Sequence, residues 1–112
     1  MDKTQGTPCL GFAVLYRWRL KEGTEAQFSA AWADITRFLR EQRGALGSRL
    51  HRCDDGTWMA YAQWPTREAW SAMQGSASGV PEASRVMKEC ILESFEDLPL
   101  TPEVDLLIPA TC

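Results

Sequence analysis

The sequence holds a single histidine and no Cys-x-x-Cys pair, so it is poor in the usual zinc ligands. Its four cysteines, Cys9, Cys53, Cys90 and Cys112, stand far apart along the 112 residues. Structural zinc sites draw their four ligands from closely spaced Cys and His residues, and this spacing therefore argues against a metal centre. A disulfide between two of the cysteines stays open, but free thiols in a reducing cytoplasm are the simpler interpretation.

Long apolar runs and an excess of positive charge are also missing. No segment approaches the roughly 18 apolar residues of a membrane span, and the acidic, weakly apolar N-terminus does not resemble a signal peptide. The formal net charge is −3; residues 1–52 hold 9 Lys and Arg against 5 Asp and Glu, and residues 53–112 hold 3 against 10. This division predicts polarity within the molecule or between subunits. We therefore expect a cytoplasmic protein with no nucleic-acid or membrane partner.

What is present is a globular composition, with 45% hydrophobic and 24% charged residues. We find no internal repeat and no low-complexity tract. The length suits one domain over residues 1–112, with a core at about 11–98 and an extended C-terminal tail at 99–112.

Hydrophobic periodicity predicts the elements of that domain. Strands are expected at residues 12–20, 46–53, 57–64 and 91–98, a long helix at 24–42, and a second helical region split into 66–74 and 82–90 around Gly75. Thr24 and Gln27 fit a capping box, Thr66 fits an N-cap, and Asp54-Asp55-Gly56 indicates a hairpin. The order β-α-β-β-α-β is the α+β, ferredoxin-like plan, a four-stranded antiparallel sheet with helices on one face.

The strand at 57–64 carries apolar side chains on both of its faces. Trp58, Ala60, Ala62 and Trp64 share one face, while Met59 and Tyr61 lie on the other. A sheet with helices on one side is ordinarily polar on the other, so something must cover the second face. We expect sheet-to-sheet homodimerisation around an enclosed cavity. Alternation alone leaves open which face opens into that cavity.

Two stretches of the sequence carry a family resemblance: AVLYRWRLKEGTEAQF at 13–28, and GxxGSRLHR, DDGTW and AYAQWPTREAW between 44 and 70. Over residues 11–98 the chain resembles the antibiotic biosynthesis monooxygenase (ABM) domain family of dimeric α/β-barrel proteins. The resemblance implies a homodimer of ferredoxin-like units whose sheets close on each other. Family members include enzymes that oxidise polyaromatic phenols with O₂ and no metal, flavin or haem, and others that cleave haem or act on quinols.

Haem cleavage is disfavoured on the residues themselves. The haem-cleaving branch uses an Asn on its first strand and a Trp–His pair in its second helical region. Aligned on the Gly-Thr turn and on Trp64, this chain has Tyr16 in place of the Asn and Met73 in place of the Trp, and residues 82–90 contain no His.

The residues that could carry chemistry are one histidine, several aromatics and several arginines. His51 is the candidate general base, because imidazole titrates near neutrality; the alternative is a surface or interface histidine. An aromatic substrate would be bound by Tyr16, Trp18, Trp58, Tyr61 and Trp64, unless these pack in the core or a dimer interface. Arg49, with Arg17, Arg19 and Arg52, could hold a carboxylate or phenolate, or could be solvated or ion-paired.

The leading hypothesis is a cofactor-independent monooxygenase of ABM type that oxidises an aromatic or quinol-like small molecule with O₂. The first alternative is a non-catalytic, dimeric module, related to stress, that binds a small hydrophobic ligand. The second alternative is a structural dimer whose barrel is filled by side chains.

Overall fold

Five antiparallel strands and three helices make up the described part of the chain, residues 10–74 and 79–110 of the computed structural model. In chain order they are β2 (Phe12–Leu20), α1 (Glu25–Gln42), β3 (Gly47–Arg52), β4 (Trp58–Trp64), α2 (Arg67–Met73), α3 (Pro81–Cys90), β5 (Ile91–Ser94) and β6 (Leu98–Leu100). The predicted α+β, ferredoxin-like class is confirmed. The predicted break at Gly75 lies outside the described residues.

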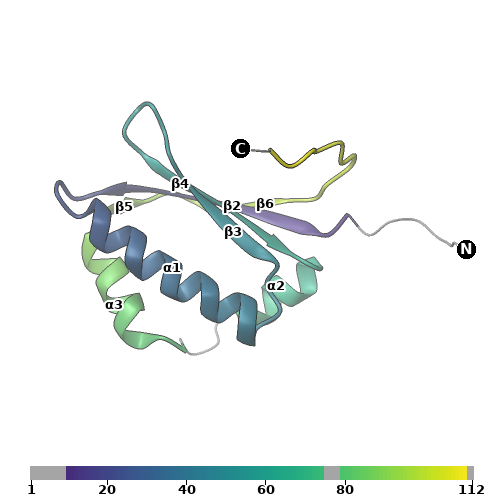
Figure 1. Ribbon diagram of the computed structural model, residues 1–112, viewed down its shortest axis with the longest axis horizontal. Coiled ribbons are helices and arrows are strands. Elements are labelled where there is room, and N and C mark those ends of the chain that lie inside the picture. The colour runs from purple at the N-terminus through teal and green to yellow at the C-terminus, as the bar shows by residue number, and fades with distance from the viewer. Residues whose placement is uncertain (1–9, 75–78, 111–112) are drawn as a thin grey trace, which may run out of the picture.

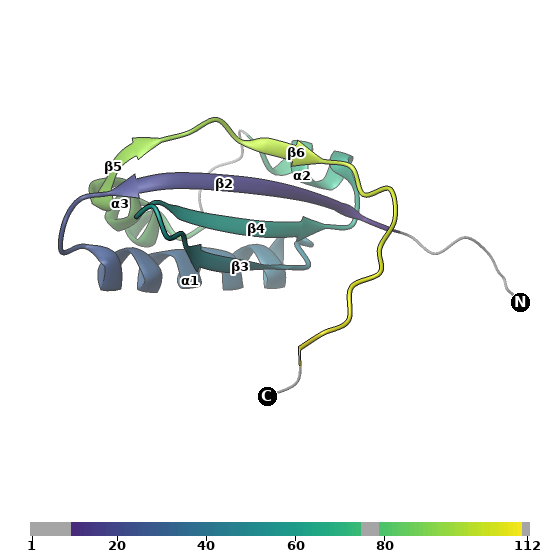
Figure 2. The ribbon, with the colours of Figure 1, turned by 90° about the horizontal axis from the view of Figure 1, so that it is seen from above.

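The sheet has the order β3-β4-β2-β5, and β6 pairs with β2 on the same edge as β5 (Figure 2). The single last strand predicted at 91–98 is therefore wrong in its extent. β5 pairs with the end of β2, through Trp18, Arg19 and Leu20, and β6 pairs with its beginning, through Ala13, Val14 and Leu15. The segment between them leaves the ladder opposite the middle of β2, and this gap matters for the site described below.

All three helices cover one face of the sheet, and the C-terminal segment after β6 extends on the side of the opposite face (Figure 1). Trp18 of β2 and Trp58 of β4 are directly paired and pack with Phe28 of α1 on the helix face. Side chains alternate along a strand, so the even-numbered residues of β2 and β4 face the helices and the odd-numbered ones face away. We call these the helix face and the outer face.

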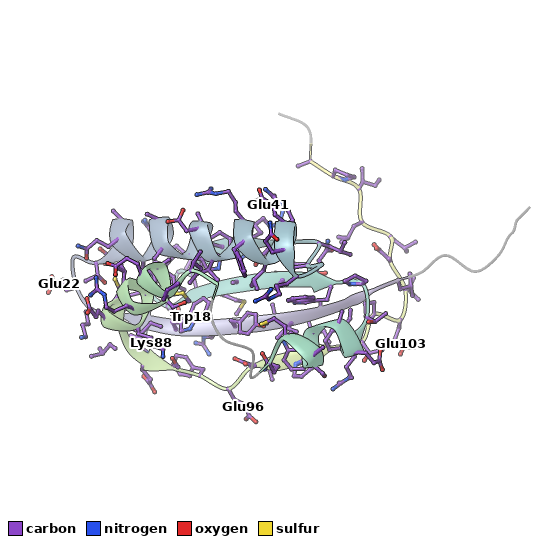
Figure 3. The ribbon with its side chains drawn as sticks, turned by 90° about the horizontal axis from the view of Figure 1, so that it is seen from below. Trp18, Glu22, Glu41, Lys88, Glu96 and Glu103 are labelled. Atoms are coloured by element: carbon purple, nitrogen blue, oxygen red, sulfur yellow. The ribbon has the colours of Figure 1, made fainter. Side chains whose placement is uncertain are left out.

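The core consists of two clusters at opposite ends of the helix face. One gathers around Phe28, Trp18 and Trp58, with ring centroids 5.2 Å apart between Trp18 and Phe28. The other contains Phe12, Val14, Trp64 and Trp70. Figure 3 shows Trp18 on the helix side, where α3 crosses the sheet. Burial of large aromatic side chains supplies most of the driving force for such a small domain.

Of the two helix caps predicted from the sequence, the one at α2 is confirmed and the one at α1 is wrong. Thr66 caps α2 as predicted, because its side chain accepts the N–H of Ala69 at 3.0 Å. The capping box predicted at Thr24 is wrong: its hydroxyl donates to the carbonyl of Lys21 at 2.7 Å instead. The turn carbonyl is the nearer partner, and it ties the start of α1 to the preceding turn. No helix among the described residues is long and apolar enough to cross a membrane.

Candidate functional site

A cavity of about 250 Å³ lies between α1 and the helix face of the sheet. Its lining is almost entirely apolar and draws on β2, β3, β4, α1 and α3. The lining residues are Tyr16, Trp18, Trp32, Ile35, Thr36, Leu39, Ala45, Gly47, Ser48, Ala62, Trp64 and Met87. The polar side-chain groups among them are the hydroxyls of Tyr16, Thr36 and Ser48 and the indole N–H groups of the three tryptophans. The site is thus an apolar pocket within one chain, formed between its sheet and its helices.

The cavity exists because small residues stand between large ones on the sheet. Ala62 of β4 pairs with Val14 of β2 on one side and with Ser48 of β3 on the other. Its methyl group leaves room above the centre of the sheet, while Trp64 and Trp18 rise from neighbouring positions. Tyr16 and Trp18 are stacked at 6.1 Å between ring centroids, with their planes 9° apart. These flat walls suit a planar aromatic ligand.

Tyr16 is held in place at the edge of this cavity by Trp70 of α2. The indole N–H of Trp70 donates to the phenol oxygen of Tyr16 at 2.9 Å. Because the oxygen is already an acceptor for Trp70, the phenol proton is left to donate to another group. Burial raises the pKa of Tyr16, the hydrogen bond from Trp70 acts in the opposite direction, and the charge of Asp97 raises it further. The phenol therefore stays protonated at neutral pH, and its proton is available for a hydrogen bond to a ligand.

The divided strand at the sheet edge explains the influence of Asp97. β5 and β6 leave β2 uncovered opposite Tyr16, and Glu96 and Asp97 occupy that interval. Burial raises the pKa of Asp97, and the neighbouring charge of Glu96 raises it further. A carboxylate near a phenol disfavours the phenolate, so the break in the strand helps to keep Tyr16 in its neutral form.

His51, Arg49 and Tyr61 belong to the outer face, where the sheet separates them from the cavity. Arg49 and His51 are odd-numbered residues of β3, and they pair with Tyr61 and Met59 of β4. The Nδ1 of His51 lies 3.2 Å from the carbonyl oxygen of Met59, and its Nε2 accepts from Arg49 Nε at 3.1 Å. Both ring nitrogens are therefore engaged. The sequence proposed these residues together with Tyr16, Trp18 and Trp64, but one chain does not bring the two groups into one site.

Trp58 shares the helix face but does not line the cavity. It is buried against Phe28, with ring centroids 6.1 Å apart, and the guanidinium of Arg52 lies 5.2 Å from the centre of its ring. Arg17 is drawn to the hairpin, where it pairs with Asp55 at 3.2 Å. In this single chain these contacts are structural, since they close the end of the sheet.

Sequence reasoning did not include Ser48 or Trp32 among the candidate site residues. A serine in a polar strand carries no signal of its own, and only the tertiary structure places its hydroxyl in the cavity. The even-odd alternation of β3, matched to that of β4, could have grouped Ser48 with Ala62. Trp32 does belong to the apolar stripe of α1, but it also lines the cavity because α1 stands off the sheet there.

Two other hollows are open surface features. A wide groove between α1 and α3 is bordered by charged side chains such as Asp34, Arg37 and Glu82. A second groove lies between the C-terminal tail and the end of the sheet near Tyr61 and Gln63. The lining of each groove is more polar than that of the cavity between α1 and the sheet, so this cavity remains the candidate active site.

Fold and cavity together define the class: an α+β protein of ferredoxin-like topology with an apolar chamber between its sheet and its longest helix. The family model described as antibiotic biosynthesis monooxygenase matches residues 11–85. The chain belongs to this ABM family.

Solved structures show the same fold. SnoaB, a cofactor-independent oxygenase from Streptomyces nogalater, matches with a TM-score of 0.70 at 20% identity, over 85% of this chain and 95% of that one. A candidate antibiotic biosynthesis monooxygenase from Bordetella bronchiseptica matches with a TM-score of 0.72 at 20% identity, over 84% of this chain and 99% of that one. Rv0793 from Mycobacterium tuberculosis matches with a TM-score of 0.67 at 16% identity, over 86% of this chain and 98% of that one. A search of curated proteins found no significant match. At such identities the likeness shows the fold, and the chemistry must be argued from the site.

Proposed function

We propose that this protein is a cofactor-independent monooxygenase of ABM type that oxidises an aromatic phenol or quinol with O₂. The observation that carries the proposal is the apolar cavity walled by Tyr16, Trp18, Trp32 and Trp64, with the phenol of Tyr16 oriented by Trp70. Family membership and the fold shared with the oxygenase SnoaB support the same reaction class.

The proposed reaction balances without a cofactor. A phenol with a hydrogen para to its hydroxyl gives a quinone: one oxygen atom of O₂ bonds to the ring carbon, and the other leaves as water. The water takes the phenolic hydrogen and the hydrogen of the ring carbon. The substrate loses the four electrons that O₂ gains, and so no outside reductant is required.

The protein's part in this reaction is to bind, orient and exclude water. The aromatic walls hold the ring flat, and their low polarity strengthens each hydrogen bond inside the cavity. As the substrate gives up electrons, negative charge develops on O₂. Tyr16 donates a hydrogen bond to the oxygen atom that gains this charge. The pKa of Tyr16 is raised, so this donor is present over the whole neutral range.

Two variants, one on each face of the sheet, test whether the reaction takes place in the cavity or beside His51, the base predicted from the sequence. We expect an O₂-dependent quinone from a panel of phenols, and none without O₂. Ala62→Leu, which fills the cavity, should abolish turnover, whereas His51→Ala should leave it within about twofold, because the sheet separates His51 from the cavity. Oxygen uptake and product absorbance measure the turnover of both variants and of the parent protein. Turnover lost in His51→Ala and kept in Ala62→Leu would move the reaction to the outer face.

A non-catalytic binding module is the second candidate function, and one observation favours it. None of the described residues that line the cavity is charged, and none is a histidine, so no strong base faces the ligand. Ligand binding without an O₂-dependent product over the whole panel would support this module. The sequestering role predicted as the alternative would then be the better assignment.

We further propose that the chain forms a homodimer through its outer face, in the cytoplasm. Leu15 and Leu98 are paired on that face, and Leu98 is 54% exposed. The tail beyond β6 exposes its large apolar side chains Val104, Leu106, Leu107 and Ile108 at 75–88%. Exposed apolar side chains on a sheet face, continuous with an apolar tail, are typical of an interface between subunits. The free thiols Cys53 and Cys90 suit a reducing compartment.

Light scattering tests the dimer. We expect twice the chain mass for the unmodified protein and a monomer for Leu98→Glu, since each symmetric interface would bury the new charge twice. Ala26→Glu places the same charge on the exposed side of α1 and should leave the mass unchanged. A monomeric unmodified protein at micromolar concentration would contradict the proposal.

A further inference from the structure

The hydroxyl of Ser48 is buried in the wall of the cavity and has no hydrogen-bond partner among the residues that the structure describes. Leaving a buried hydroxyl unpaired costs about 1–3 kcal/mol, and native proteins keep few such groups. The environment of Ser48 is otherwise apolar, with Ala45, Gly47 and Ala62 as neighbours in the lining. A ligand atom bound beside this wall would supply the missing hydrogen bond.

Ser48 and Tyr16 stand on opposite sides of the cavity. Ser48 pairs with Ala62, and Tyr16 pairs with Ala60 two positions along the same strand. β3 and β2 are separated only by β4, so with the offset of two residues the backbones of Ser48 and Tyr16 lie about 12 Å apart across the sheet. Both side chains belong to the helix face and enter the same cavity. A flat ligand between them meets one hydroxyl at each end and apolar surface in the middle.

The lining determines the charge of the ligand. Among the described residues the lining has no charged side chain, and its polar side-chain groups are hydroxyls and the indole N–H groups of its tryptophans. An ionised carboxylate, sulfonate or amine would lose its hydration there without a partner of opposite charge, which is strongly unfavourable. The ligand that enters is therefore neutral, with oxygen atoms that can exchange hydrogen bonds with hydroxyl groups.

The volume determines the size of the ligand. An apolar cavity of about 150 Å³ holds one benzene molecule, and pockets for drug-sized ligands run from about 300 to 1,000 Å³. The cavity here, at about 250 Å³, lies between these limits. It accommodates one ring or two fused rings with small substituents, and part of a tricyclic or tetracyclic skeleton would project out of it.

We infer that the ligand of this cavity is a neutral phenol or quinol of one or two fused rings, anchored by a hydrogen bond to Ser48 opposite Tyr16. The inference rests on the proposed function for its choice of cavity, and it narrows the substrate class. Ser48 acts as a binding and orienting residue: it fixes which ring position lies next to Tyr16.

Binding measured without O₂ tests the inference separately from catalysis. Equilibrium dialysis measures the affinity for four ligands: 1-naphthol, naphthalene, 1-naphthoate and a tricyclic phenol. They differ in the presence of a hydroxyl group, in charge and in the number of rings. We expect 1-naphthol to bind best and Ser48→Ala to weaken it about 3- to 10-fold, as expected for one hydrogen bond. Naphthalene should bind equally to both proteins. Ser94→Ala, an exposed serine on β5, is the matched control and should change nothing.

Two results would overturn the inference. The first is a tricyclic phenol or 1-naphthoate that binds as tightly as 1-naphthol, which contradicts the size or charge limit. The second is a Ser48→Ala variant that weakens both 1-naphthol and naphthalene equally, or neither of them. Ser48→Ala removes an unpaired hydroxyl, so it should fold at least as stably as the parent. Binding as expected with no O₂-dependent product would instead leave the inference standing and remove the oxygenase proposal.

Discussion

Tyr16→Phe is expected to lower the turnover of an aromatic phenol about a hundredfold, with little change in substrate binding. The change keeps the ring that lines the cavity and removes the hydroxyl that Trp70 orients. Loss of one donor to a developing negative charge typically costs about 10²–10³ in kcat. Because the hydrogen bond strengthens as charge develops, kcat should fall more than KM rises.

The pH profile separates a donor role for Tyr16 from a role as a base. Burial and the charge of Asp97 raise the pKa of Tyr16 above its ordinary value of 10.0, so the phenol loses its proton only in more alkaline solution. The ratio of parent to Tyr16→Phe turnover should then be constant between about pH 7 and pH 9. A ratio that grows steadily with pH over this range would indicate a phenolate base and contradict the donor role.

Tyr61→Phe is the matched control for this prediction. Tyr61 is also a strand tyrosine, but its hydroxyl lies on the outer face, 3.4 Å from the side chain of Gln63. It should keep turnover within about twofold of the parent, because it touches neither the cavity nor the cluster around Trp70. Equal losses in the two variants would mean that the phenol in the cavity has no special part in the reaction.

Trp64→Ala is expected to lower the free energy of unfolding by about 3–5 kcal/mol, the usual cost of deleting a buried aromatic side chain. Trp64 is 1% exposed, and it packs in the cluster with Phe12, Val14 and Trp70. Total stabilities of domains are about 5–15 kcal/mol, so this single change removes a large part. Urea denaturation at fixed protein concentration measures it, since a dimer would make stability depend on concentration.

Two further variants keep this prediction testable if Trp64→Ala does not fold. Trp64→Phe keeps an aromatic ring and should lose less than half as much. Arg67 lies at the exposed start of α2, with its guanidinium 5.0 Å from the centre of the Phe12 ring. Arg67→Ala should cost less than about 1 kcal/mol, because that contact is open to solvent. A loss below about 1 kcal/mol for Trp64→Ala would contradict the role of this residue in the core.

Most of the fold could be predicted from the sequence because its signals are local. Asp54-Asp55-Gly56 placed the hairpin, where Gly56 adopts a φ of +89° that a side chain would disfavour. Thr66 marked the start of α2, and the apolar stripe of α1 marked its length. Two local signals failed: Thr24 found a nearer partner in the turn, and the last strand divided because Glu96 and Asp97 leave the ladder.

The candidate site was predicted in part, and the reason lies in strand geometry. Alternation correctly grouped Tyr16 with Trp18 on one strand and Trp58 with Trp64 on another, and it set Tyr61 apart. It said nothing of which face meets the helices, because that depends on where α1 and α3 pack. The prediction therefore combined His51, Arg49 and Tyr61 with residues from the opposite face.

The sequence by itself determined the family, the order of elements and the membership of each strand face, because turns, caps and periodicity are encoded within a few neighbouring residues. Only the tertiary structure decided which face forms a cavity, because that depends on where α1 and α3 pack on the sheet. It also decided where Ser48 and Tyr16 lie, because distant segments of the chain bring apolar walls around both residues.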